Sequence, residues 1–115
     1  MLPNKMKISE HATSSLKRLQ GNSGLTVNIG ARLAFFASID RGFRFNPVTD
    51  SVEHNGRELD KQTWLGDHGI ITEELLKENY PSFTNSQLHD AWAAHIDDGS
   101  RHLQSKSSLA NLLPS

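Results

Sequence analysis

The 115-residue sequence contains no cysteine. This absence excludes disulfide bonds, thiolate zinc sites, iron–sulfur clusters and a cysteine nucleophile. Long apolar runs are also missing. None approaches the roughly 18 residues of a membrane-spanning helix, and the opening MLPNKMKISE has no apolar signal-peptide core. We therefore expect one soluble, cytoplasmic domain that covers residues 1–115, because a chain of this length forms a single hydrophobic core.

Motifs for catalysis are missing as well. No GxSxG, HExxH or GxxxxGK[ST] pattern occurs, so the sequence gives no signal for a serine hydrolase, a zinc protease or a nucleotide-binding P-loop. The adjacent pairs Glu73-Glu74 and Asp97-Asp98 point to different sides of a helix and cannot share a proton as a catalytic pair does. The sequence therefore predicts a protein that is not an enzyme and that has no catalytic residues and no cofactor.

One group of residues has the spacing of metal ligands. His95, Asp98 and His102 lie at positions i, i+3 and i+7 of a predicted helix, which could bring nitrogen and oxygen ligands onto one face. Histidine is also favourable near a helix C-terminus, where it interacts with the helix dipole. We favour this second interpretation and predict no metal site.

Two capped helices are predicted in the first 40 residues. Residues 4–8 alternate polar and apolar side chains, as in a short extended arm with its apolar residues inward. Ser9 is a suitable N-cap for the first helix, which ends at the glycine-containing segment 21–24. Thr26 is the N-cap of the second helix, which covers residues 27–39 and is the most apolar segment of the chain.

The second helix is expected to be covered on nearly all sides. Ile29 and Leu33 belong to one predicted apolar face, and further apolar residues extend it most of the way round. Gly30 costs about 1 kcal/mol of helix propensity relative to alanine, a cost that close approach of another helix would offset. We predict that this is the central core helix and that four of its residues form an oligomer interface: Gly30, Ala34, Phe35 and Ala37.

The remaining chain predicts a mainly α fold, a compact bundle of four or five helices behind the short extended N-terminal arm. Residues 40–66 are the least regular, and Asn55-Gly56 favours either a small β-hairpin around residues 51–60 or a mobile loop. Residues 70–79 form a helix that Pro81 stops. A longer helix runs from about residue 84 to residue 104, with apolar residues at offsets typical of one buried helix face.

Charge divides the chain into two parts. Residues 1–44 contain seven basic and two acidic residues, a net charge of +5, whereas residues 45–115 contain five basic and eleven acidic residues, a net charge of −6. The basic part predicts a surface that binds the nucleic-acid backbone without reading sequence. Its candidate residues are Lys5, Lys7, Lys17, Arg18, Arg32, Arg41 and Arg44.

Other interpretations of this charge pattern stay open. The basic part could pack on the acidic part, within one subunit or between subunits. Seven cations are too few for tight duplex binding at physiological salt, so oligomerisation would matter. The order arm–helix–helix is also that of ribbon–helix–helix repressors, in which paired arms lie in the major groove.

The sequence resembles the DndE family of DNA sulfur modification proteins over almost its whole length. The shared features are Leu2-Pro3-Asn4, the helix start at Ile8-Ser9, and Gly24-Leu25-Thr26 before Asn28 and Arg32. The segments GREL at 56–59 and TWLG at 63–66 resemble the middle of the family, and the final Leu-Leu-Pro resembles its end. Val27 departs from the proline that the family often has after the threonine.

The resemblance implies a role in DNA phosphorothioation, in which sulfur replaces a non-bridging phosphate oxygen of bacterial DNA. It implies a small, mostly helical subunit without catalytic residues, beside a cysteine desulfurase, an adenylating sulfur-transfer protein and an ATPase. It also implies a homo-oligomer, a tetramer. From the resemblance and the charge together we expect a DNA-binding accessory protein that holds double-stranded, including nicked, DNA. The alternative is an assembly subunit that binds the other modification proteins but not DNA.

Overall fold

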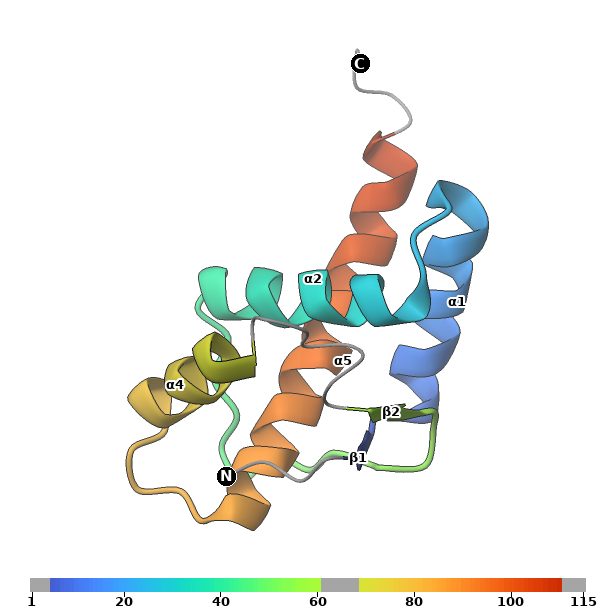
Figure 1. Ribbon diagram of the computed structural model, residues 1–115. Coiled ribbons are helices and arrows are strands. Elements are labelled where there is room, and N and C mark those ends of the chain that lie inside the picture. The colour runs from blue at the N-terminus through green and yellow to red at the C-terminus, as the bar shows by residue number, and fades with distance from the viewer. Residues whose placement is uncertain (1–4, 61–68, 111–115) are drawn as a thin grey trace.

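The computed structural model describes residues 5–60 and 69–110 of the chain. As predicted, the fold is mainly helical (Figure 1). Its elements in chain order are β1 (Lys5–Lys7), α1 (Glu10–Ser23), α2 (Val27–Asp40), β2 (Glu58–Asp60), α4 (Gly69–Asn79) and α5 (Asn85–Ala110). No helix in these described ranges is both long and apolar enough to cross a membrane.

The two predicted helix caps are confirmed. The Ser9 hydroxyl accepts a hydrogen bond from the Ala12 N–H at 3.0 Å, and the Thr26 hydroxyl accepts one from the Ile29 N–H at 3.3 Å. Each cap satisfies one of the backbone amides that the first turn of a helix leaves unpaired. α1 ends at Gly24, whose positive φ of 79° is the left-handed conformation that glycine adopts without strain.

The hairpin predicted around residues 51–60 is wrong. β2 pairs with β1 in an antiparallel two-stranded sheet, not with the residues that precede it in the chain. Met6 lies opposite Leu59, and both side chains are buried. The N-terminal arm is therefore a strand with an inward apolar side, as predicted, but its partner comes from the middle of the chain.

Asn55 and Gly56, the two residues that favoured a hairpin turn, instead contact the start of α1. The Asn55 side-chain oxygen accepts a hydrogen bond from the Glu10 N–H at 2.8 Å, and the Gly56 N–H donates to the Ile8 carbonyl at 2.8 Å. A Cβ at Gly56 would collide with the backbone oxygen of Ser9. The Asn-Gly pair is thus used for a tertiary contact, which a local turn pattern does not reveal.

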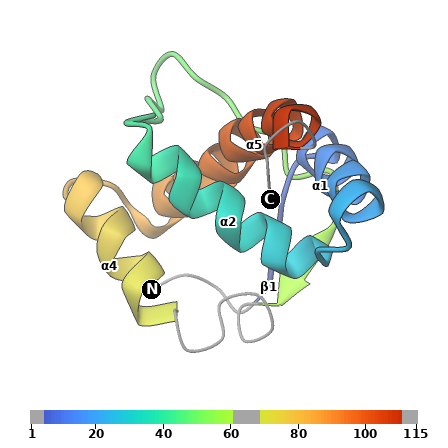
Figure 2. The same ribbon diagram turned by 90° about the horizontal axis from the view of Figure 1, so that it is seen from above.

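Small residues let α2 pack closely against both α1 and α5. A Cβ on Gly30 would lie 3.1 Å from Cδ2 of Leu16 on α1. A Cβ on Gly99 of α5 would collide with the backbone of Ala34 on α2. Figure 2 shows α2 crossing α5, with α1 and α4 on opposite sides of the crossing. Packing within one chain therefore accounts for the small residues at this crossing.

The described part of the chain leaves one side of α2 exposed, so the predicted cover on nearly all sides would have to come in part from another subunit. Ile29 is 40% exposed and Leu33 is 43% exposed. The buried side is made instead by Val27, Gly30, Ala31, Ala34, Phe35 and Ser38. The helix is so apolar that periodicity could not show which of its sides faces the core.

The last two described helices match their predictions closely. α4 ends at Asn79, two residues before Pro81, and α5 runs from Asn85 beyond the predicted end near residue 104. The predicted apolar face of α5 lies in the core, where Trp92, His95 and Ile96 are all completely buried. α5 thus forms the central support against which α1 and α2 pack.

Candidate nucleic-acid interface

The two predicted arm cations flank a buried residue. Lys5 and Lys7 are exposed on β1, on either side of the buried Met6. The strand register places Lys7 opposite Glu58 and Lys5 opposite Asp60. Opposite charges at such positions attract each other across a sheet. The charge of Lys7 therefore has the acidic residue Glu58 of the same chain opposite it.

The remaining cations lie at two separate places. Lys17 and Arg18 are exposed on α1, and Arg41 and Arg44 follow the other end of α2. The 14 residues of α2 span about 20 Å at 1.5 Å per residue, and Figure 1 shows α1 and the last turn of α2 on opposite sides of the fold. Arg32 is half-buried on α2 and already has an interaction. One chain does not gather all seven cations into one patch.

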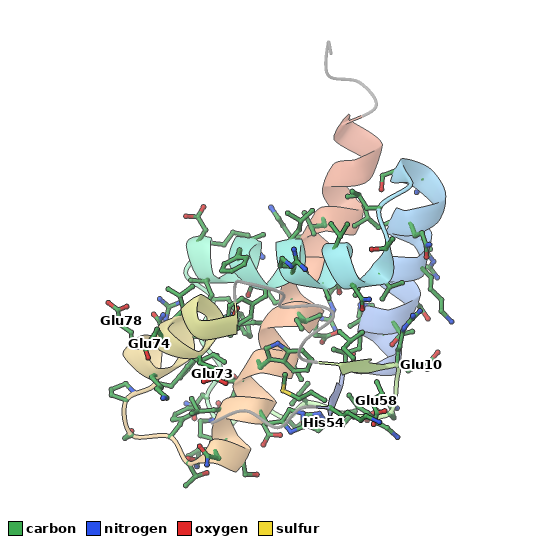
Figure 3. All side chains as sticks on the ribbon, viewed as in Figure 1. Glu10, His54, Glu58, Glu73, Glu74 and Glu78 are labelled. Carbon is green, nitrogen blue, oxygen red and sulfur yellow. The ribbon has the colours of Figure 1, made fainter. Side chains whose placement is uncertain are left out.

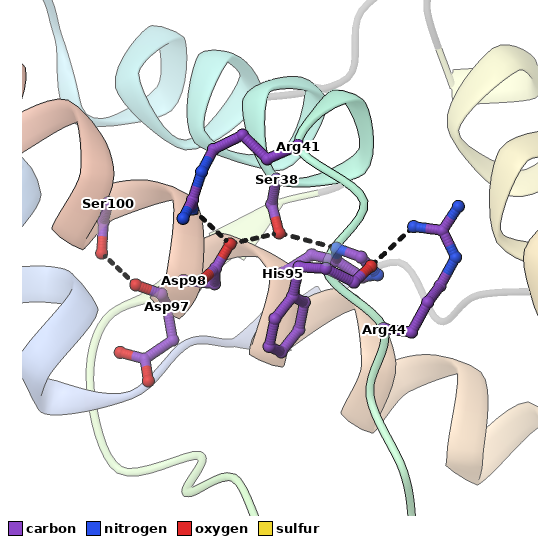
Figure 4. A network of polar contacts seen from close by, with 8 residues as sticks. Ser38, Arg41, Arg44, His95, Asp97, Asp98 and Ser100 are labelled. Carbon is purple, nitrogen blue, oxygen red and sulfur yellow. Dashed lines mark hydrogen bonds and ion pairs between the residues drawn. The ribbon is translucent and has the colours of Figure 1, made fainter.

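The two arginines after α2 differ in how they are held. Nη1 of Arg41 forms an ion pair with Oδ2 of Asp98 at 3.0 Å. Nη1 of Arg44 donates to the carbonyl of its neighbour Phe43 at 2.6 Å, and its side chain is exposed. Both arginines are drawn in Figure 4. Arg41 is thus partly neutralised, whereas no carboxylate of the described residues forms an ion pair with Arg44.

A buried polar network lies directly beneath these arginines. Ser38 on α2 contacts both Nδ1 of His95 and Oδ2 of Asp98 at 2.8 Å (Figure 4). Nε2 of His95 contacts the Tyr80 hydroxyl at 2.7 Å, and the Tyr80 oxygen accepts a hydrogen bond from the Phe45 N–H at 2.7 Å. Ser38 and His95 are completely buried. The network joins α2 and α5 to the segment that follows α2, at Phe45, and to the segment that precedes α5, at Tyr80.

Burial keeps His95 neutral. Removal of the imidazole from water is the largest cause, and the charge of Arg44 adds to it, so that the pKa of His95 falls to about 4 although Asp98 opposes the change. Burial also raises the pKa of the Tyr80 hydroxyl above its ordinary value. At neutral pH the network therefore contains a neutral histidine and a protonated tyrosine.

Serine, histidine and aspartate meet here, but not in the order that catalysis requires. In a nucleophilic triad the histidine lies between the serine and the aspartate, so that it can take the serine proton. Here Ser38 lies in the middle and gives its hydroxyl hydrogen bond to the Asp98 carboxylate. The serine is also completely buried. This arrangement is structural and does not activate a nucleophile.

The predicted metal-ligand spacing does not assemble a site in the part of the chain that the structure describes. Both ring nitrogens of His95 are hydrogen-bonded to Ser38 and Tyr80, and Asp98 accepts from Ser38 and Arg41. Among the described residues no group of three histidine or carboxylate side chains could hold a metal ion.

Acidic residues lie on α4 and along a groove beside α5. α4 carries Glu73, Glu74 and Glu78, which Figure 3 shows on the side of the fold away from α1. A groove of about 360 Å³ between the segment 43–52 and α5 is lined by Asp97 and Asp98 among other residues. Like charges disfavour DNA at α4, whereas Asp97 and Asp98 of the groove form ion pairs with Arg101 and Arg41.

The comparisons with known proteins agree on one family. The family model for DNA sulphur modification protein DndE matches residues 5–111. This chain belongs to the DndE family.

The structure also superposes on solved DndE structures. DndE from Escherichia coli B7A, involved in DNA phosphorothioation modification, is 48% identical with a TM-score of 0.83, over 87% of this chain and 97% of that chain. A DndE G21/24K mutant involved in DNA phosphorothioation is 45% identical with a TM-score of 0.83, over 90% and 99% of the two chains. No curated protein matches the chain. The resemblance stated from the sequence is thus confirmed.

Sequence reasoning missed two members of the network of this DndE-family protein, Ser38 and Tyr80. A signal for them exists, because His95 lies on the predicted buried face of the longest helix and a buried imidazole needs hydrogen-bond partners. Tyr80 is the only tyrosine of the chain and directly precedes Pro81. Which partners reach the imidazole depends on the packing of α2 on α5, which the sequence does not show.

Proposed function

We propose that this DndE-family protein is a non-catalytic accessory subunit of DNA phosphorothioation that holds the backbone of double-stranded DNA, including duplex at a strand break. The observation that carries the proposal is the excess of cations in residues 1–44, five of which are exposed and in no ion pair among the described residues: Lys5, Lys7, Lys17, Arg18 and Arg44. Cations of this kind bind phosphates without reading bases.

The proposal includes a homo-oligomer, a tetramer, because one chain presents its cations on β1, on α1 and after α2, and not in a single patch. Of the four interface residues predicted on α2, Gly30, Ala34 and Phe35 are buried by their own chain and Ala37 is half-buried. The apolar side chains that the helix leaves exposed, Ile29 and Leu33, lie on its other side. A second copy on α2 would cover them and add its cations to those of the first.

A titration with DNA tests the proposal. Fluorescence anisotropy would compare intact duplex, nicked duplex and single strand at two salt concentrations, and sedimentation of the same sample would give the subunit number. Reversal of Lys17 and Arg18 to glutamate should weaken binding and lower the salt slope by about one for each phosphate that the variant no longer neutralises. Lys77→Glu on the acidic helix α4 is the matched control and should leave the slope unchanged.

A second candidate function is an assembly subunit that binds the other phosphorothioation proteins without binding DNA. The position of Lys7 opposite Glu58, and the pair Arg41–Asp98, favour it, because these cations already have acidic neighbours. Absence of DNA binding at low salt would select this function. The ribbon–helix–helix alternative is less favoured, since β1 pairs with β2 of the same chain and is not an isolated arm.

A further inference from the structure

The segment 41–45 that follows α2 carries two of the cations that the sequence predicts to bind DNA, and side chains distant in sequence hold it in place. Gly42 adopts a positive φ of 86°, which turns the chain back at the end of α2. The Phe43 N–H then donates to the Ser38 carbonyl at 3.3 Å, and the Phe43 ring meets the His95 ring edge-on at 5.0 Å between centroids. The turn is therefore seated on α5.

The hydrogen bonds of the buried network have one self-consistent direction. The Asp98 carboxylate can only accept, so the Ser38 hydroxyl donates to it, and the Ser38 oxygen accepts from Nδ1–H of His95. Since the imidazole is neutral, its Nε2 carries no proton and accepts from the Tyr80 hydroxyl. The Tyr80 oxygen is then free to accept from the Phe45 N–H. Each hydrogen bond of the network therefore has one defined donor and one defined acceptor.

The hydrogen-bond network contacts Arg41 directly but reaches Arg44 only through the backbone of its neighbour. At one end, Asp98 Oδ2 accepts from both Ser38 and Arg41, so the carboxylate fixes and neutralises Arg41. At the other end, Tyr80 holds the backbone of Phe45, the residue directly after Arg44. The exposed Arg44 side chain thus stands on a turn whose backbone is fixed on both sides.

We propose that Tyr80, His95 and Ser38 are positioning residues that fix the 41–45 turn so that Arg44 contacts a DNA phosphate, while Arg41 is held by Asp98 and contributes little to binding. The inference rests on the proposed DNA-binding function and deepens it. An ordered arginine loses less conformational freedom on binding than a mobile one, so a fixed turn raises affinity without adding a contact.

A double-mutant cycle measured as DNA affinity tests this coupling. Tyr80→Phe removes one hydroxyl and leaves the ring. It should lower DNA affinity about fivefold to tenfold and reduce the salt slope by about one, the same changes that we expect for Arg44→Ala. In the Arg44→Ala background Tyr80→Phe should have almost no further effect. Combined with Lys17→Ala on α1, the two reductions in binding free energy should simply add.

The outcomes separate this inference from the proposed function. If the unchanged protein binds no duplex at low salt, the proposed function fails and the inference fails with it. If it binds, but Tyr80→Phe weakens binding equally in the Arg44→Ala and Lys17→Ala backgrounds, or leaves affinity unchanged, only the positioning role is overturned. Circular dichroism checks the fold of each variant. Ser38→Ala, which interrupts the same chain between His95 and Asp98, replaces Tyr80→Phe in the cycle if that variant unfolds.

Discussion

Two irregular segments of this protein are fastened by different means. The turn 41–45 is held from below by a buried chain of side-chain hydrogen bonds through Tyr80 and His95. The loop 53–57 is held at the start of α1 by Asn55 and Gly56. His54 also ties it to the Lys7 carbonyl and to Asp90 on α5. The first segment rests on a completely buried imidazole, and the second requires the absence of a side chain at Gly56. Each can therefore be broken by a different change.

The largest effect is expected from adding a methyl group where backbones touch. Gly99→Ala would drive a Cβ into the Ala34 backbone at the α2–α5 crossing beside the network, at a cost of about 3–4 kcal/mol in the free energy of unfolding. Gly56→Ala, in the loop, should cost about 2 kcal/mol, since a surface loop can shift more easily than two packed helices. Urea unfolding measures both changes.

The exposed helical Gly21 is the matched control. A Cβ there meets nothing within 4 Å, and Gly21→Ala should stabilise the protein by about 0.5–1 kcal/mol because alanine has the higher helix propensity. Equal destabilisation by all three substitutions would show that the close backbone contacts do not exist.

Acid should lower the free energy of unfolding through the buried network around His95. The pKa of His95 is lowered from 6.5 to about 4 by burial, so the unfolded chain binds a proton that the folded chain does not between these values. The free energy of unfolding should keep its full value above pH 6.5 and should fall by about 3 kcal/mol as the pH drops to 4. His89, whose pKa is also lowered by burial, acts in the same direction.

The variant His95→Gln isolates this contribution. It cannot take up a proton, so its loss of stability between pH 6.5 and pH 4 should be clearly smaller than that of the unchanged protein. Thermal unfolding followed by circular dichroism across this pH range measures the difference. An unchanged pH dependence would mean that His95 titrates normally in the folded protein.

On the loop side, removing one cap should have a smaller effect. Asn55→Ala removes the acceptor of the Glu10 N–H at the exposed start of α1, and we expect a loss of about 1 kcal/mol. Asn55→Asp keeps the acceptor but loses the hydrogen bond that the Asn55 amide donates to Glu53, so it should recover only part of the lost stability. If both variants unfold at the same denaturant concentration as the unchanged protein, water replaces the cap without cost.

The smallest effect is expected at the surface of α5. Arg101 pairs with Asp97 four residues before it at 3.2 Å, and the arginine side chain is 62% exposed. Arg101→Ala should change the free energy of unfolding by less than about 0.5 kcal/mol, because solvent screens such pairs. A loss as large as that of Asn55→Ala would show that this pair has a structural role.

Local sequence patterns were sufficient to predict much of the fold but little of the candidate site. The caps at Ser9 and Thr26 and the buried face of α5 follow from residues within one or two turns of each other, so they could be predicted. The partner of β1 could not, because two weakly apolar strands can pair in several ways. The exposed side of α2 was also unpredictable, since the helix is apolar all round.

By itself, the sequence determined the helical class, the family and the division of charge between its two parts. These properties depend on short-range periodicity, on residues read in order, and on simple counts. Only the tertiary structure decided that Arg41 meets Asp98 whereas Arg44 does not, and that Ser38 lies between His95 and Asp98. Those contacts join residues 57 to 60 positions apart. They exist because glycine and alanine at the α2–α5 crossing let the two backbones approach closely.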